Sequence, residues 1–137
     1  MSIEAYVNFN GNCREAVLFY AEVFETEAPQ FMTFGDGDMS GVPPVSEEAK
    51  KLIMHTALTI GGSRVMFSDT FPGWPFTVGN NITLTYISKD KEEHRRFFDR
   101  LKVGGKVDME LEKTFWSPQF GSLVDKYGVP WQFSVEE

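Results

Sequence analysis

The stretch FWSPQFGSLVDKYGVPWQFSV, from Phe115 to Val135, decides the fold. Residues 120–125 and 131–135 have the short, apolar, alternating pattern of two strands. Between them, Gly128 and Pro130 supply the turn chemistry that reverses a chain. An isolated hairpin is only marginally stable in water, so we expect this hairpin to close a larger sheet.

The composition is that of one folded domain. A chain of 137 residues can bury roughly two-thirds of its unfolded surface. Hydrophobic residues make up 42% of it, including 13 phenylalanines, which excludes a disordered chain. Neither a membrane-length apolar run nor a signal pattern at the N-terminus is present, so we expect no membrane association. The single cysteine cannot form an intramolecular disulfide, which favours a cytoplasmic location.

The net charge of −7 bears on possible partners. Nucleic-acid phosphates demand a basic face, so this charge argues against a nucleic-acid partner. Where charge selects a small-molecule ligand, it favours a neutral or cationic one. Acidity also serves simply to keep a protein soluble, and both interpretations remain open.

The first half of the chain alternates strand and helix patterns. Asn12 is placed to cap a helix, and Glu15 is placed to complete a capping box. Asp36 and Asp38 lie in a loop at 35–44 and indicate turn chemistry, because no glutamate follows at calcium-loop spacing. The elements predicted here are a strand at 3–9, the helix after Asn12, a strand at 25–34, a short helical turn from Ser46, and strands at 51–60 and 63–68 joined by Gly61-Gly62.

The second half repeats this order. Asp90 is placed to cap a helix, with Glu93 at its box position, and Gly104-Gly105 ends that helix. Asn12 and Asp90 are 78 residues apart, and a glutamate and an aromatic pair recur at the same offset. The strands predicted around this helix are 81–87, 106–114 and the two of the terminal hairpin.

These elements predict an α+β fold of two tandem βαβββ modules forming curved mixed sheets around a cleft. We expect a single domain, residues 1–137, with module 1 at about 1–70 and module 2 at about 80–137. The linker, at about 71–79, belongs to the aromatic stretch DTFPGWPFTVG, which has no periodicity.

Three ordered motifs carry a family resemblance. Phe9 to Tyr20 reads FNGNCREAVLFY, and Met54 to Gly62 reads MHTALTIGG, followed by Ser68-Asp69. The third motif runs through the terminal hairpin and consists of Trp116, Phe120, Gly121, Asp125, Tyr127, Gly128 and Trp131. Together they resemble the vicinal-oxygen-chelate superfamily of glyoxalase I, extradiol dioxygenases and bleomycin-resistance proteins. Within it, they are similar to the phosphonate-operon-associated branch labelled 3-demethylubiquinone-9 3-methyltransferase-like.

The methyltransferase label does not fit the residues. A nucleoside pocket of the usual kind needs a parallel α/β pattern with a glycine-rich turn between strand and helix, and neither is present. We therefore expect no S-adenosylmethionine site and no other cofactor.

The resemblance also allows a test for a metal. The ligand positions of metal-dependent members fall near Ala5, on residues 64–66, on residues 81–83 and on Gln132. None of these is a histidine, aspartate or glutamate, whereas a catalytic zinc or iron site needs two or three such ligands. The chain has only two histidines. We expect no metal site, and we expect His94 to be solvated on its helix.

Strand parity selects His55 as the candidate catalytic residue. On strand 52–60, Met54, Leu58 and Ile60 form the more apolar face, which should meet a helix. His55 then points to the opposite face, which lines the cleft that the resemblance implies. A histidine there can act as a general base or as a hydrogen-bond donor, or can have a purely structural role.

The candidate ligand-binding residues are polar or aromatic. Gln132 and Ser134 share the polar face of the last strand, and a glutamine can both donate and accept hydrogen bonds. Trp74 and Trp116 lie in segments without strand pattern and could stack on a ligand, plug a core or contact a second chain. The full set is Gln132, Trp74, Trp116, Tyr86, Asp69 and Ser134. Cys13, in the first turn of a capped helix, could have a lowered thiol pKa, but it is not a candidate nucleophile.

Three functions stay open. The first is a metal-independent small-molecule-binding protein, like the drug-sequestering members of the superfamily. The second is an enzyme acting on a small oxygenated or aromatic substrate, with His55 as general base. The third is a structural or regulatory protein with an empty cleft. Members of the superfamily commonly form dimers, so the resemblance implies a homodimer.

Overall fold

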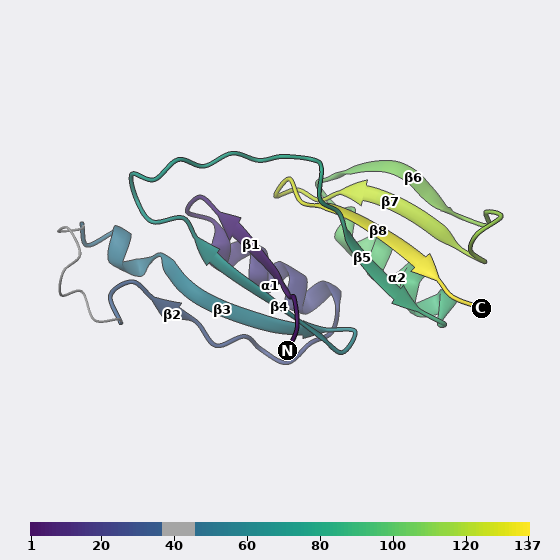
Figure 1. The fold of residues 1–137 in the computed structure, drawn as a ribbon, viewed down its shortest axis with the longest axis horizontal. Helices are drawn as coiled ribbons and strands as arrows, with labels where there is room; N and C mark the ends of the chain where they lie inside the picture. Colours follow the sequence, from purple (N-terminus) through teal and green to yellow (C-terminus); the bar gives the residue numbers. More distant parts are fainter. Residues whose placement is uncertain (37–45) are drawn as a thin grey trace. The chain divides into compact units, whose positions relative to one another are not determined.

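The computed structural model describes residues 1–36 and 46–137 and divides the chain into two compact units, Met1–Thr77 and Val78–Glu137 (Figure 1). The first unit contains β1 (Ala5–Phe9), α1 (Cys13–Val23), β2 (Met32–Thr33), a short 3-10 helix η1 (Ala49–Lys51), β3 (Ile53–Ile60) and β4 (Ser63–Asp69). The second contains β5 (Leu84–Ser88), α2 (Lys91–Leu101), β6 (Lys106–Glu112), β7 (Phe120–Val124) and β8 (Pro130–Val135).

Each unit folds into one four-stranded mixed sheet with the same topology. The strand orders are β1-β4-β3-β2 and β5-β8-β7-β6. In each sheet, the first strand pairs in parallel with the last one, and the remaining pairs are antiparallel. The predicted α+β class and the repeated βαβββ order are therefore confirmed.

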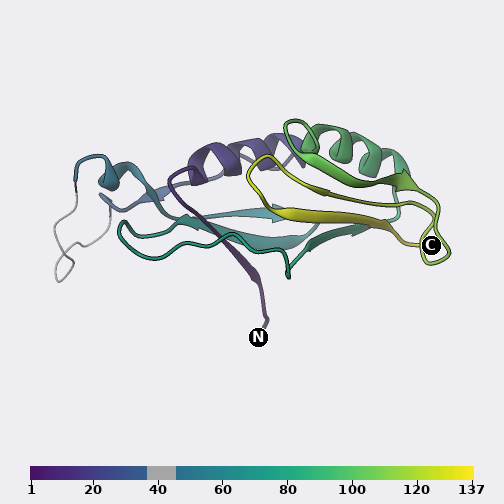
Figure 2. The same ribbon diagram turned by 90° about the horizontal axis from the view of Figure 1, so that it is seen from above.

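One helix covers one face of each sheet (Figures 1 and 2). In the first unit, Tyr20 of α1 stacks on Phe67 of β4, with ring centroids 5.7 Å apart. In the second, Phe98 of α2 meets Phe133 of β8 edge to face at 5.5 Å. Both phenylalanines of the sheets are fully buried, so each helix–sheet layer contains its own hydrophobic core.

Several predicted boundaries were wrong. The strand expected at 25–34 is reduced to Met32–Thr33, because Glu25 has a positive φ of 54° and Pro29 cannot donate to a ladder. The strand expected at 81–87 lies at Leu84–Ser88, and the one expected at 106–114 ends at Glu112.

The helical turn expected from Ser46 is present, and the Ser46 hydroxyl accepts a hydrogen bond from the Ala49 amide at 3.1 Å. Asp38 lies outside the described residues.

The two helices begin differently. Asp90 caps α2 as predicted, and its carboxylate accepts from the Glu93 amide at 3.0 Å. Asn12 makes no such bond at the start of α1. There the Asp69 carboxylate, at the end of β4, accepts from the amides of Gly11 and Cys13 instead. Asp69, which lies far along the chain, therefore caps α1 in place of the predicted capping box.

No helix in the described ranges, 1–36 and 46–137, is both long and apolar enough to cross a bilayer.

Candidate functional site

His55 lies on the face of the first sheet opposite α1, as strand parity predicts. On β3, Thr56, Leu58 and Ile60 are buried, whereas His55 and Ala57 alternate with them and are partly exposed. The Nδ1 atom of His55 lies 3.3 Å from the Tyr6 hydroxyl, and the two rings are 5.9 Å apart. Tyr6 is therefore the nearest partner of the imidazole on this face.

The surroundings of His55 are polar and hollowed. Ser68 of β4 donates to the side-chain oxygen of Asn8 on β1 at 3.2 Å, on the same side of the sheet as Tyr6. A hollow of about 700 Å³ is lined by residues 26–30 and by residues 55–59 of β3. His55 thus stands both on the open sheet face and at the wall of a hollow.

Gln132 and Ser134 lie together on the face of the second sheet opposite α2. Their neighbours on β8, Trp131 and Phe133, are buried on the helix side. The Nε2 atom of Gln132 donates to the Thr85 hydroxyl at 2.8 Å. Trp116 reaches the same side, because its ring meets that of Phe120, the cross-strand partner of Ser134, at 5.2 Å.

Two of the predicted ligand-binding residues have structural partners instead. Tyr86 faces α2, is only 9% exposed and donates from its hydroxyl to the Glu93 carboxylate at 2.5 Å. Burial, together with that carboxylate, raises the pKa of the tyrosine well above its ordinary value. Asp69 is 3% exposed, and its two oxygens accept from the amides of Gly11, Cys13 and Ile53. Neither side chain joins His55 or Gln132.

Trp74 is an exposed aromatic residue after the end of β4. It belongs to the first unit and is 70% exposed, and its backbone amide donates to the Phe71 carbonyl at 3.1 Å. Phe71 packs edge to face on Phe34 at 5.3 Å, which anchors the start of this aromatic segment. The indole of Trp74 is thus an exposed aromatic surface beside an anchored loop.

The positions that hold a metal in metal-dependent members carry no histidine, aspartate or glutamate in this chain. Within the described residues, no group of three or more His, Cys, Asp or Glu side chains could hold an ion. Arg64 is bound through two nitrogens to the Glu4 carboxylate, at 2.9 and 2.8 Å. The Gln132 amide is engaged by Thr85. We therefore derive no chemistry through a metal.

The environment of Cys13 disfavours its thiolate. It is fully buried, and burial and the Asp69 charge raise its pKa to about 12. The lowered pKa suggested by its place in the first helical turn is therefore wrong, because desolvation outweighs the helix dipole.

His94 was predicted to be solvated, and this is wrong: it is fully buried in the core of the second unit. Its ring lies 5.1 Å from Tyr86 and 5.6 Å from Phe133, and its Nε2 atom lies 2.8 Å from the Ser88 hydroxyl. Nδ1 is buried without a hydrogen-bond partner. The spacing of His94 to Phe97, Phe98 and Leu101 is that of one helical face, which could have revealed its burial.

We predict that His94 makes the second unit acid-sensitive. Burial lowers its pKa below the ordinary value, although Glu93 and Asp90 oppose the shift. The unfolded chain therefore binds a proton at higher pH than the folded one. The contribution of neutral His94 to the free energy of unfolding should be fully present above about pH 6.5, the ordinary pKa of histidine in an unfolded chain. It should be lost as the pH falls below that value. Urea unfolding between pH 8 and 5 measures this, and a His94→Gln variant should lose stability less steeply. Equal slopes would contradict the assignment.

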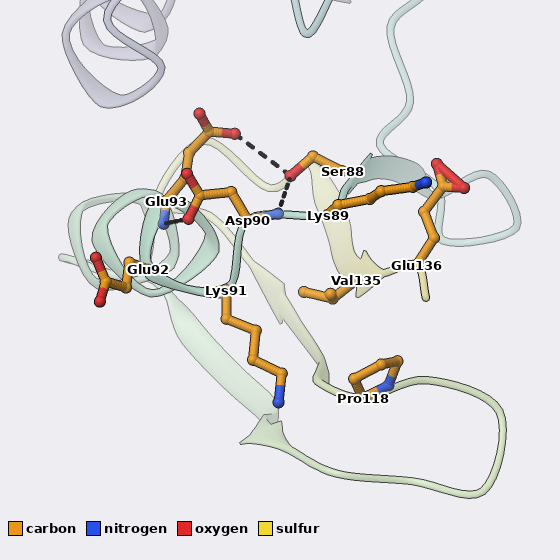
Figure 3. Close-up of a pocket in the computed structure, with 9 residues that line it drawn as sticks. All are labelled: Ser88, Lys89, Asp90, Lys91, Glu92, Glu93, Pro118, Val135 and Glu136. Atoms are coloured by element: carbon orange, nitrogen blue, oxygen red, sulfur yellow. Dashed lines mark hydrogen bonds between the residues drawn. The ribbon is translucent and has the colours of Figure 1, made fainter.

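A further hollow, of about 710 Å³, lies at the start of α2 (Figure 3). The close-up shows the Ser88 side chain between the Glu93 carboxylate and the Asp90 amide, and the Asp90 carboxylate on the Glu93 amide. These bonds are those of a capped helix, and lysine and glutamate side chains both line the hollow. The bonds among Ser88, Asp90 and Glu93 are accounted for by the cap, so we assign no ligand to this hollow.

Comparisons with known proteins identify a family and relatives that match almost the whole chain. A family model described as 3-demethylubiquinone-9 3-methyltransferase matches residues 1–134. The chain is 33% identical over 141 residues to the protein YjdN of Escherichia coli (strain K12), covering 98% of this chain and 95% of that protein. The crystal structure of PA1353 from Pseudomonas aeruginosa is similar with a TM-score of 0.86 and 34% identity, over 99% of this chain and 98% of that one.

More distant structures confirm the fold. A PhnB protein from Bacillus cereus has a TM-score of 0.73 and 25% identity, covering 98% of this chain and 99% of that one. The fosfomycin resistance protein FosX from Listeria monocytogenes, solved with Mn(II) and 1S,2S-dihydroxypropylphosphonic acid, has a TM-score of 0.58. At 13% identity, over 99% of this chain and 92% of that one, FosX shares the fold alone. The fold expected from the sequence motifs is confirmed.

Proposed function

The chain belongs to the 3-demethylubiquinone-9 3-methyltransferase family, and from this premise we propose that it binds a small organic molecule on the open faces of its sheets without a bound metal. Methyl transfer is not part of the proposal. The parallel pairs β1–β4 and β5–β8 each belong to a small mixed sheet, and neither builds the nucleotide pocket of a doubly wound fold.

The observation that carries the proposal is the Tyr6–His55 pair. A hydroxyl and an imidazole 3.3 Å apart occupy the face opposite α1, and His55 also lines the hollow of about 700 Å³. Binding sites combine such a hollow with a few convergent polar groups. The acidic net charge supports a neutral or cationic ligand over an anionic one.

A second candidate function is catalysis with His55 as general base. In the tautomer whose Nδ1–H donates to the Tyr6 hydroxyl, Nε2 holds a lone pair that can accept a proton. Tyr6 would then orient the imidazole, as a hydrogen-bonded second group commonly does for a histidine. The observation that favours this function is the same contact, so an experiment must separate it from binding alone.

We predict that His55→Ala reduces the amount of small molecule that co-purifies with the protein by about 5- to 100-fold, since one lost hydrogen bond to a ligand is worth ~1–3 kcal/mol. The measurement is mass spectrometry of compounds released by denaturing the protein after gentle purification from cell lysate. Tyr6→Phe should produce a smaller loss, because it removes only the hydroxyl.

The control is Glu47→Gln, which alters an exposed carboxylate on the turn before η1. It should retain the wild-type amount. A bound compound that His55→Ala retains but no longer converts would favour the catalytic function. The same set of compounds in similar amounts on the wild type and on His55→Ala, with no conversion by either, would overturn both.

A further inference from the structure

Resting on the binding function above, we propose that the second unit takes an organic cation of the quaternary ammonium class at one corner of its sheet. The corner is formed by Trp116, Phe120 and Glu112, and we refer to it as the aromatic corner. It lies on the same side of the sheet as Ser134, which pairs across the strands with Phe120.

The two rings of the corner contact each other. Phe120 begins β7, and its ring faces away from α2, because the next residue, Gly121, lies against Leu111 on the helix side. Trp116 meets Phe120 at 5.2 Å with an interplanar angle of 72°, and meets Phe115 at 4.8 Å and 85°. Trp116 nevertheless remains 53% exposed. A tryptophan that contacts Phe120 and is still half exposed leaves room for a ligand beside its ring.

A carboxylate stands beside these rings. Glu112 ends β6 and is the cross-strand partner of Phe120, so the two side chains are direct neighbours on one face of the sheet. Its carboxylate makes no hydrogen bond or ion pair within the described part of the chain. The nearest lysine in sequence, Lys113, lies just beyond the end of β6 and makes no ion pair with Glu112; it lines a hollow of about 290 Å³ together with Lys91 and Phe115.

This combination selects the charge of the ligand. The negative face of an indole attracts a cation, and tryptophan is the strongest of the aromatic side chains in this respect. An uncompensated carboxylate adds a Coulombic attraction of the same sign. An anion would be repelled by Glu112, and a neutral molecule would gain only the apolar contact. A diffuse, weakly hydrated cation such as a trimethylammonium group is attracted both by the indole of Trp116 and by the carboxylate of Glu112.

The test uses choline and its neutral isostere 3,3-dimethyl-1-butanol as probes of the full chain. The chain has three tryptophans, and their indole N–H signals can be followed separately by NMR. The Trp131 indole is buried and donates to the Asp125 carboxylate at 2.8 Å, so its signal serves as an internal reference. We expect choline to shift the Trp116 signal saturably and the isostere to bind at least about 5-fold more weakly.

Variants test whether the aromatic corner is the choline site. Glu112→Gln keeps the shape and removes the charge, so it should weaken choline binding about 3- to 10-fold at the Trp116 signal. Trp116→Ala removes that signal, so its choline affinity is measured by isothermal titration calorimetry, and it should be lost. Asp99→Asn removes a half-exposed carboxylate of α2, the helix that covers the opposite face of this sheet, and should change little. Equal affinity of choline and the isostere, or an unchanged Trp116 signal, would overturn the proposal. The His55 experiment measures compounds that co-purify with the protein, whereas this one measures added choline, so either proposal can fail without the other.

Discussion

Replacing Asp69 with alanine is expected to lower the free energy of unfolding by about 3–5 kcal/mol, a large part of the stability of a typical small domain. The carboxylate is only 3% exposed and accepts three backbone amides. They belong to Gly11 at 2.8 Å, Cys13 at 3.0 Å and Ile53 at 2.8 Å. These bonds join the end of β4 to the start of α1 and the start of β3.

The magnitude follows from what the substitution leaves behind. A hydrogen bond to a charged acceptor contributes ~1.5–3 kcal/mol, and a buried donor without a partner costs ~1–3 kcal/mol. Water entering the cavity would recover part of the loss. Asp69→Asn should fall between the wild type and Asp69→Ala, because its single oxygen replaces two and its amide group faces N–H donors.

Urea unfolding at neutral pH gives the free energies, and Asp108→Asn supplies the control. Asp108 is an aspartate of β6 whose carboxylate is half exposed and lies 4.0 Å from the Lys106 ammonium. Its replacement should change stability by less than about 0.5 kcal/mol. If Asp69→Ala lost no more than Asp108→Asn, the three amides would not depend on this carboxylate.

The repeated fold could be predicted because local patterns carry it. Patterns of only a few residues predict the hairpin at the C-terminus, the turn at Gly61-Gly62 and the capped helix after Asp90. Strand parity then placed His55, Gln132 and Ser134 on the faces opposite the helices. Alternation needs no knowledge of which strands are neighbours, so these assignments did not depend on tertiary contacts.

The partners of those residues could not be predicted in the same way. Tyr6 meets His55 only because β4 lies between β1 and β3, and Thr85 meets Gln132 through a parallel pairing of strands 47 residues apart. The capping of α1 by Asp69 depends on the same long-range register. Sequence periodicity predicts a face but not the neighbour across the sheet, so it also left Asp69 among the ligand candidates.

The second large effect is expected from Gly105→Ala, which should destabilise the second unit by about 3 kcal/mol or more. A Cβ atom at this position would collide with the Val124 carbonyl oxygen and lie 3.0 Å from the Asp125 Cα. Both neighbours are backbone atoms, so no side-chain rotation relieves the clash. The chain passes here from the end of α2 into β6, whose first residue, Lys106, pairs with Val124. Strand pairing therefore holds the colliding atoms in place.

Gly79→Ala is the matched control for Gly105→Ala, because its added Cβ would meet only the Asn81 side-chain oxygen at 3.6 Å, an ordinary contact. That variant should be neutral or slightly more stable, since alanine restricts the unfolded chain by about 0.4–1 kcal/mol relative to glycine. Thermal and urea unfolding of both variants measure the difference. Equal stabilities would mean that the β6–β7 edge yields to admit a methyl group. A loss confined to Gly105→Ala instead identifies the close passage of two backbones as the reason why this position holds glycine, independently of its place near a helix end.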